Sequence, residues 1–270
     1  MLKQITENVW VHESDCMQSN TTIVKGNSGV LVVDAGLTTA EMKSVAEDLK
    51  TMGLVVNTGF STHPHWDHVL WDVEFGDVPR YGTERTAAQM KSQLSSPDWK
   101  AKEETELPEE VAGQVPLDNL FGQLTALPAG TTSLPWDGPE VTIVEHSGHA
   151  PGHAALIIKD ERVLVAGDMM SDVFIPMLNL AANDPISDYL NALQQFEDQI
   201  SDVTFVIPGH GSIGKDDEVS KRLEQDRAYV KALRDKSDSK DLRIISPKEG
   251  WDWVAGIHEW QVKTIGDKGN

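Results

Sequence analysis

The 270-residue chain contains a single cysteine, Cys16, and no apolar run long enough to span a membrane. One cysteine excludes a disulfide within the chain and is typical of proteins in a reducing compartment. Residues 1–7 also lack the apolar stretch of a secretory signal peptide. These absences predict a cytoplasmic protein that does not associate with membranes.

The sequence is also poor in basic residues, with 23 Lys and Arg against 43 Asp and Glu, for a formal net charge of −20. A negative field of this size repels phosphate backbones and anionic lipid surfaces. It disfavours a nucleic-acid partner and favours a small-molecule substrate that is neutral or modestly charged. No linker rich in Pro, Ser or Gly divides the chain, so we expect residues 1–270 to form one domain. The oligomeric state is not fixed by the sequence, and a dimer is compatible with it.

A dense run of metal-competent side chains occupies residues 63–68, which read H-P-H-W-D-H. In an extended segment, residues two apart point to the same side, so His63 and His65 can reach one metal ion together. The chain must then turn, which lets Asp67 and His68 face a second ion nearby. Nitrogen and oxygen ligands suit zinc, and also iron or manganese. The alternative, a chance run of surface histidines, is disfavoured by the density of the cluster.

Further candidate ligands follow short β-branched runs that end in Gly or Pro, a pattern typical of buried strands that lead into loops. Residues 141–144 precede a stretch with three histidines, residues 163–167 precede Asp168, and residues 203–207 precede His210. Loops at strand ends are held by a rigid sheet and often carry binding or catalytic residues.

The pattern of residues 63–68 resembles the signature of the metallo-β-lactamase-fold superfamily of hydrolases, and the resemblance extends over residues 20–215. It implies two divalent metal ions held by side chains of this chain, with zinc favoured over iron or manganese. The first ion would take His63, His65 and His149, the second would take Asp67, His68 and His210, and Asp168 would bridge them. Asp67 is also the candidate catalytic residue, because its free oxygen could orient the attacking hydroxide.

The third histidine of the first site has two competitors, His146 and His153. His149 lies between Gly and Ala, which fits the family pattern, although Ser147 stands where the family usually has proline. His153 begins a strand-like run, and we expect it to donate a hydrogen bond that orients a ligand or the substrate. His146 is interpreted as a core residue.

The remaining candidates also have structural interpretations. Asp168 could be a turn residue and His210 a plain loop residue, although their places at strand ends favour ligand roles. His12 and His258 are expected to be ordinary, partly exposed histidines.

The order of the expected elements indicates the fold class. Strands are expected at 4–12, 20–26, 30–35, 54–61, 141–146, 154–159, 162–167 and 203–207, and helices at 38–52, 83–95, 186–200, 215–236 and 247–264. Residues 26–29 read as a hairpin turn, with Thr38 and Gly53 as start and stop signals of the first helix. Strands followed by helices, twice over, fit an α/β (α+β) αββα sandwich, in which two mixed sheets pack face to face with helices outside.

Residues 95–139 differ from the rest, with six prolines and a charged segment at 100–110. Insertions at this point often form a cap over the site in the resembled family. We expect a cap that brings Leu117, Leu120, Phe121 or Leu124 to the site, and the alternative is a solvated loop region.

Five apolar residues close in sequence to the candidate ligands have two interpretations. They form either a wall of the substrate site or part of the core: Trp66, Trp71, Met169, Met170 and Phe174.

The resemblance implies hydrolysis of an ester, lactone or related carbonyl bond in a small molecule by metal-bound hydroxide. Asp168 favours the lactonase, esterase and glyoxalase-like branches, because broad-spectrum zinc β-lactamases generally lack the bridging aspartate. Residues 169–174 and 241–270 contain no tyrosine, which departs from quorum-quenching lactonases and glyoxalase-type enzymes respectively. The alternatives are a β-lactamase-type amide hydrolase, a mononuclear-iron persulfide dioxygenase, and a non-catalytic binding module.

Overall fold

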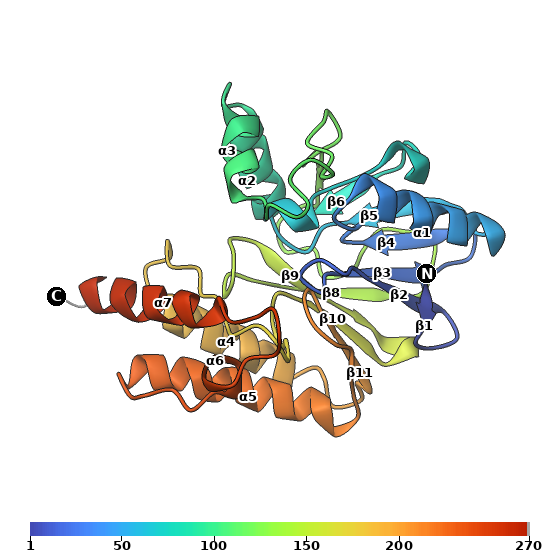
Figure 1. Cartoon of the computed structure of the whole chain (residues 1–270). Coiled ribbons are helices and arrows are strands. Elements are labelled where there is room, and N and C mark those ends of the chain that lie inside the picture. The colour runs from blue at the N-terminus through green and yellow to red at the C-terminus, as the bar shows by residue number, and fades with distance from the viewer. Residues whose placement is uncertain (269–270) are drawn as a thin grey trace.

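Two mixed β-sheets pack face to face in the structure, a computed structural model that describes residues 1–268 (Figure 1). Helix α1 lies on the outer face of one sheet, and α4 and α5 lie on the outer side of the other. This arrangement confirms the αββα sandwich expected from the sequence.

The first sheet holds the N-terminal strands in chain order. It consists of β1 (Lys3–Gln4), β2 (Val9–Glu13), β3 (Asn20–Lys25), β4 (Val30–Val33), β5 (Val56–Phe60), β6 (Arg80–Gly82) and β7 (Thr125–Ala126). Strands β1 to β4 are antiparallel, and β4 to β7 are parallel.

The second sheet has the order β12-β11-β10-β9-β8. Its strands are β8 (Val141–His146), β9 (His153–Ile158), β10 (Val163–Gly167), β11 (Phe205–Pro208) and β12 (Gly214–Lys215). Only β10 and β11 pair in parallel.

The helices connect and cover the sheets. The α-helices are α1 (Thr39–Thr51), α2 (Glu84–Leu94), α3 (Trp99–Glu106), α4 (Pro185–Glu197), α5 (Asp217–Arg234), α6 (Leu242–Ile245) and α7 (Val254–Lys268). Three short 3-10 helices are η1 (Trp66–His68), η2 (Val73–Phe75) and η3 (Lys159–Glu161). None of the helices within residues 1–268 combines the length and the apolar character needed to cross a bilayer.

Alternation along the strands separates the core into layers. On β4, Leu31 and Val33 face the second sheet, whereas Val30 and Val32 pack with the buried face of α1. This period of two is what a strand buried on both faces requires. Burial of each such side chain contributes about 1.5–3 kcal/mol, so the frame that carries the loops is well fixed.

Most boundaries agree with the local signals in the sequence. Thr38 caps α1 in a capping box with Glu41, and Gly53 beyond its end has a positive φ of 71°. The turn at residues 26–29 is closed by the Gly26 N–H donating to the Gly29 carbonyl at 2.7 Å. The elements that were not predicted are β6, β7, β12, η1, η2, α3 and α6.

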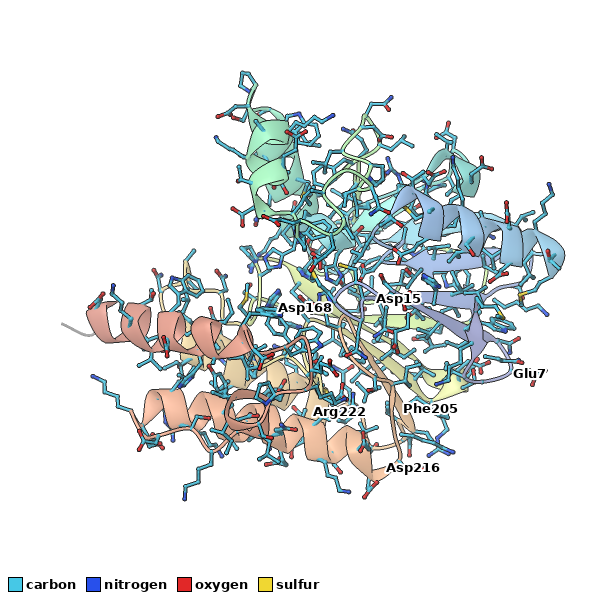
Figure 2. The ribbon with its side chains drawn as sticks, viewed as in Figure 1. Glu7, Asp15, Asp168, Phe205, Asp216 and Arg222 are labelled. Carbon is cyan, nitrogen blue, oxygen red and sulfur yellow. The ribbon has the colours of Figure 1, made fainter. Side chains whose placement is uncertain are left out.

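The ends of the parallel strands determine where the site forms. Parallel pairing places the carboxyl ends of β4 and β5 at one edge of the first sheet, and those of β10 and β11 at one edge of the second. Figure 2 shows Asp168, just after β10, between the part that carries α1 and the part that carries α4 and α5. Loops from both sheets therefore meet at one place.

Candidate metal centre

Residues 63–68 follow β5 directly and adopt the expected path. His65 is extended, with φ −81° and ψ 152°, and the chain then turns into η1 over Trp66–His68. His63 and His68 are fully buried, and Asp67 is nearly so. The alternating and then turning segment thus points its side chains toward two neighbouring places, as the spacing predicts.

The first group joins His63, His65, His149 and Asp168. The Nδ1 atom of His65 lies 3.1 Å from Nε2 of His63 and 3.0 Å from Nε2 of His149. The Oδ2 atom of Asp168 lies 3.4 Å from Nε2 of His149 and 3.6 Å from Nε2 of His63. Ligands about 2.0–2.1 Å from a tetrahedral zinc are separated by roughly 3.3 Å, so these spacings fit one ion.

The second group joins Asp67, His68 and His210. The Oδ2 atom of Asp67 lies 3.1 Å from Nε2 of His210 and 3.4 Å from Nε2 of His68. The Oδ1 atom of Asp168 approaches the same two nitrogens, at 3.6 and 3.2 Å respectively. One oxygen of Asp168 therefore faces each group, the arrangement of a carboxylate that bridges two ions.

Hydrogen bonds on the far side of the rings fix which nitrogen His63, His149 and His210 present to the site. His149 Nδ1 donates to the Met177 carbonyl at 2.8 Å, and His210 Nδ1 donates to the Met17 carbonyl at 3.0 Å. His63 Nδ1 lies 3.0 Å from Thr62 Oγ1, and that hydroxyl already donates to Asp34 at 2.8 Å, so it accepts from the ring. The proton thus sits on Nδ1, and the Nε2 lone pair is directed into the site.

Asp34 also belongs to the site, although nothing in the sequence singled it out. Its carboxylate accepts from the Thr62 N–H at 2.9 Å, from the Thr62 hydroxyl, and from His68 Nδ1 at 2.8 Å. It sits in the left-handed region, with φ 51°, just after β4, a strained conformation for a residue with a Cβ. An aspartate directly after a buried apolar strand is the same signal that identified Asp168.

We expect Asp34→Ala to weaken metal binding by about 10- to 100-fold, because His68 would lose the acceptor that orients its ring. Titration with zinc against a competing chelator measures this change. Asp34→Asn is the matched control, because it keeps the shape, one acceptor oxygen and tolerance of positive φ. Equal affinities for the wild type and Asp34→Ala would contradict the role.

His153 is oriented differently from the expectation. Its Nε2 accepts the backbone N–H of Asp168 at 3.1 Å, so it positions a candidate ligand by accepting rather than by donating. Its Nδ1 lies 2.9 Å from Nε2 of His146, which is buried as predicted. A Cβ at Gly167 would collide with His153 Nε2, and a Cβ at Gly209 would collide with Asp168 Oδ1. Only glycine fits these two places.

The donor set fits cations better than it fits an empty protein interior. Three nitrogens with lone pairs converge at His65, and His68 Nε2 and Asp168 Oδ1 are buried without a hydrogen-bond partner. Buried polar atoms are rarely left unpaired. A cation bound in each group would satisfy these atoms and screen the repulsion among the lone pairs.

The electrostatics differ between the two groups. Burial holds the pKa of His63 well below its usual range and lowers the pKa of His65 to about 3. Burial opposes charge on the second group as well, yet the pKa of His68 is raised well above its usual value by Asp67 and Asp168. Burial would also raise the pKa of Asp67, but His68 and His210 hold it well below its usual range. The first group offers neutral imidazoles, whereas the second pairs the Asp67 carboxylate with charged imidazoles, whose protons a bound cation would displace.

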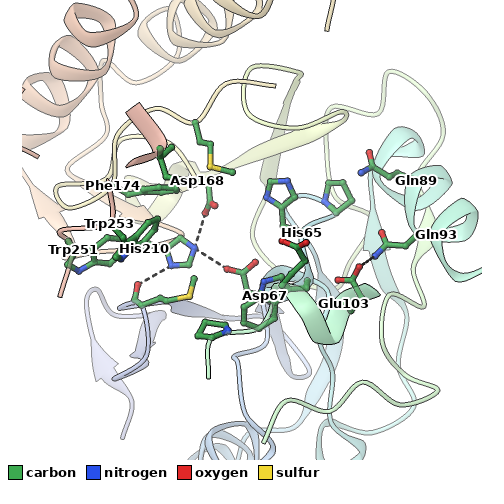
Figure 3. Close-up of a pocket in the computed structure, with 17 residues that line it drawn as sticks. His65, Asp67, Gln89, Gln93, Glu103, Asp168, Phe174, His210, Trp251 and Trp253 are labelled. Carbon is green, nitrogen blue, oxygen red and sulfur yellow. Dashed lines mark hydrogen bonds and ion pairs between the residues drawn. The ribbon is translucent and has the colours of Figure 1, made fainter. Parts of the chain in front are cut away.

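A cavity of about 530 Å³ opens onto the candidate ligands, a size typical of small-molecule sites. Figure 3 shows Phe174, Trp251 and Trp253 on one side of His210 and Asp168, with Gln89, Gln93 and Glu103 on the other. The aromatic wall comes from the loop after β10 and the segment before α7, and the polar wall comes from α2 and α3.

The structure divides five apolar residues between the two interpretations left open by the sequence, and it corrects the expectation about residues 95–139. Of the five residues with two interpretations, Trp66 and Phe174 line the cavity, whereas Trp71, Met169 and Met170 are buried in the core. Residues 95–139 contribute Glu103, Glu106 and Pro108 to the cavity. Four apolar residues of this segment were expected at the site: Leu117, Leu120, Phe121 and Leu124. They pack instead with the core that includes the buried face of α1, because apolar side chains are stabilised most where water is excluded.

The two histidines outside the site also differ from each other. His258 is partly exposed, as expected, and lies 3.1 Å from the Tyr229 hydroxyl. His12 is buried rather than partly exposed, and neither of its ring nitrogens has a hydrogen-bond partner. Burial lowers its pKa, which keeps the ring neutral. The expectation of exposure was wrong because His12 lies on β2, a strand buried along nearly its whole length.

An αββα sandwich that gathers two His/Asp groups at the edges of its sheets defines the class of metallo-β-lactamase-fold proteins. The family described as the metallo-beta-lactamase superfamily matches residues 14–210. The chain therefore belongs to this superfamily, whose members are mostly hydrolases.

Individual relatives are distant. The chain is 22% identical over 211 residues to the acyl-coenzyme A thioesterase MBLAC2 of Gallus gallus, and the aligned region covers 72% of each protein. A metallo-beta-lactamase family protein from Thermus thermophilus has a TM-score of 0.63 at 21% identity, covering 97% of this chain and 90% of that one. A metallo-beta-lactamase from Pontibacter korlensis has a TM-score of 0.60 at 19% identity, covering 83% and 97%. At these identities the two solved structures show a shared fold.

Proposed function

We propose that this protein hydrolyses an ester, thioester or lactone bond in a small molecule, with two divalent cations, zinc above all, one bound in each group of ligands. The observation that carries this proposal is the placement of Asp168. Its two oxygens face different groups, each of which contains further buried ligands. Bound cations would supply a nucleophile from water at neutral pH and polarise the carbonyl oxygen of the substrate.

The side chains of this protein have distinct roles in the proposal. His63, His65 and His149 would hold one cation, Asp67, His68 and His210 would hold the other, and Asp168 would contribute to both. Asp67 also lines the cavity, so its carboxylate can accept a hydrogen bond from the attacking water and hold it toward the substrate. Thioesters belong in the substrate range because the curated relative is a thioesterase.

The alternatives have less support. A mononuclear-iron dioxygenase would not need a complete second group, yet Asp67, His68 and His210 are all buried and converge. A dedicated β-lactamase is disfavoured by Asp168, and amides also have poorer leaving groups than esters or thioesters. Nucleic acids are disfavoured by the net charge of −20.

Elemental analysis combined with a substrate panel tests the proposal. We expect about two transition-metal ions per chain, and loss of hydrolysis after chelation with recovery on reloading. Esters, thioesters and lactones should exceed β-lactams in kcat/KM, and RNA should not be cleaved. Metal should also raise the melting temperature, because ligands from distant segments converge only in the folded state. Full activity after verified metal removal, or β-lactams as the best substrates, would overturn the proposal.

A further inference from the structure

Three aromatic rings line one end of the cavity beside the candidate ligands. The centroid of the Phe174 ring lies 5.5 Å from that of Trp253 and 6.1 Å from that of Trp251, and the two indoles stack at 5.3 Å. The centroid of the Trp251 ring also lies 6.4 Å from that of the His210 ring. Trp251 is buried, whereas 45% of Trp253 is exposed, so part of its indole remains open to a ligand. Indole rings bind both apolar groups and cations.

The charges around these rings are of one sign. The cavity at the candidate ligands is lined by Glu103 and Glu106 in addition to those ligands. An adjoining cavity shares Trp251 and Trp253 with it, and carries the carboxylates of Asp15, Glu110 and Glu249. Among the described residues that line the two cavities, none is Lys or Arg.

The nearest cation in sequence does not change this balance. Lys248, three residues before Trp251, donates a hydrogen bond to Asp172 and lines neither cavity. The excess of acidic residues over the whole chain adds to the local negative potential. A leaving group that carries phosphates, such as coenzyme A, would find carboxylates where it needs basic side chains.

We propose that the two indoles and the surrounding carboxylates bind an ammonium ion, so that the preferred substrates are esters or thioesters whose leaving group is cationic. The ammonium group would lie against Trp251 and Trp253, and the carbonyl group beside Asp67, Asp168 and His210. These ligand residues line the same cavity, and Asp168 Oδ1 is buried there without a partner. The inference rests on the proposed function in taking this cavity as the substrate site.

Three thioesters with one acyl group test the charge preference in the metal-loaded protein. They are butyrylthiocholine, its neutral isostere S-(3,3-dimethylbutyl) thiobutyrate, and butyryl-coenzyme A. A cation held by an indole is stabilised by an amount that corresponds to about 10-fold in kcat/KM. We therefore expect butyrylthiocholine to exceed the neutral isostere by about 10-fold, and butyryl-coenzyme A to be the poorest of the three. Equal values for the cationic and neutral substrates would overturn the inference and leave the proposed function standing.

Binding of the alcohols separates the inference from the hydrolysis. Choline and 3,3-dimethylbutan-1-ol differ only in the charge of their bulky end, and tryptophan fluorescence or calorimetry reports their affinities. We expect choline to bind about 10-fold more tightly. If this preference holds while none of the thioesters is cleaved, the ammonium site stands and thioester hydrolysis, as part of the proposed function, fails. No binding of choline at millimolar concentration would overturn the inference.

A pair of matched variants locates the ammonium site. Trp253→Leu should lower the preference for choline to about 2-fold or less, because one cation-binding indole is lost. Trp260→Leu is the control, since Trp260 is 50% exposed on the neighbouring α7 and does not line the cavities. Glu249→Gln should reduce the preference in the same direction. A preference unchanged in Trp253→Leu, or reduced equally in Trp260→Leu, would contradict the assignment.

Discussion

Asp168→Ala should reduce bound metal from about two ions per chain to about one, and reduce kcat for any ester substrate by at least about 100-fold. The substitution removes the carboxylate whose oxygens lie 3.2 Å from His68 Nε2 and 3.4 Å from His149 Nε2. Without it, two cations held close together would lose the anion that screens their repulsion. Each group would then retain three ligands, and we expect the occupancy of the second site to fall sharply.

The measurement is metal content by elemental analysis after dialysis, together with kcat and a circular dichroism spectrum that checks the fold. Asp168→Asn keeps the shape but removes the charge, and should fall between the wild type and Asp168→Ala. His153→Ala should cost less, since this ring contacts Asp168 only through the backbone N–H. Full metal content in Asp168→Ala combined with loss in His153→Ala would show that the ligands are wrongly assigned.

Arg243→Met should destabilise the protein by about 3–5 kcal/mol, because it leaves a buried carboxylate without its partner. Arg243 and Asp226 are 2% and 1% exposed, and their atoms Nη1 and Oδ1 lie 2.7 Å apart. The same guanidinium donates to the carbonyls of Ser171 at 2.8 Å and Phe174 at 3.0 Å. The variant therefore also frees the loop that follows Asp168, and metal affinity should fall with stability.

Denaturation by urea measures the loss, and Arg234→Met provides the control. Arg234 is 51% exposed and pairs only with its neighbour Asp235, so its loss should cost less than about 1 kcal/mol. Burial raises the pKa of Asp226 even against the attraction of Arg243, and the variant should raise it further. A carboxyl group with a raised pKa in the folded state costs stability in full above that pKa, and the cost disappears as the pH falls to the pKa of the unfolded state. The defect should therefore shrink as the pH falls, and a defect that grows in acid would contradict this account.

Each candidate ligand named from the sequence follows a local rule, and the structure brings these residues into two neighbouring groups. His63 and His65 are two apart in an extended segment, and Asp168 and His210 each follow a buried strand. Asp34 obeys the same rule but is not part of the ligand set that the family resemblance implies, so nothing singled it out before the fold placed it 2.8 Å from His68.

The cavity walls were harder to predict, because they depend on how distant segments pack. Helix α3 has no buried residue and no apolar face, so periodicity could not reveal it. It nevertheless delivers Glu103 and Glu106 to the cavity. Leu117 and Phe121 carry the stronger apolar signal, and that signal marked the core instead of the site. Apolar character predicts burial, and it does not distinguish a binding wall from a core.

The order of these parts along the chain has an evolutionary consequence. The candidate ligands all fall within residues 14–210, the portion matched by the superfamily, whereas Trp251, Trp253 and Ile257 lie beyond it. Mutations in the C-terminal segment can therefore alter what is recognised while the inherited ligand set stays intact. Members of this superfamily can therefore differ in substrate while they keep the same ligands. By the same reasoning, residues 249–257 can be exchanged as one segment to change substrate preference.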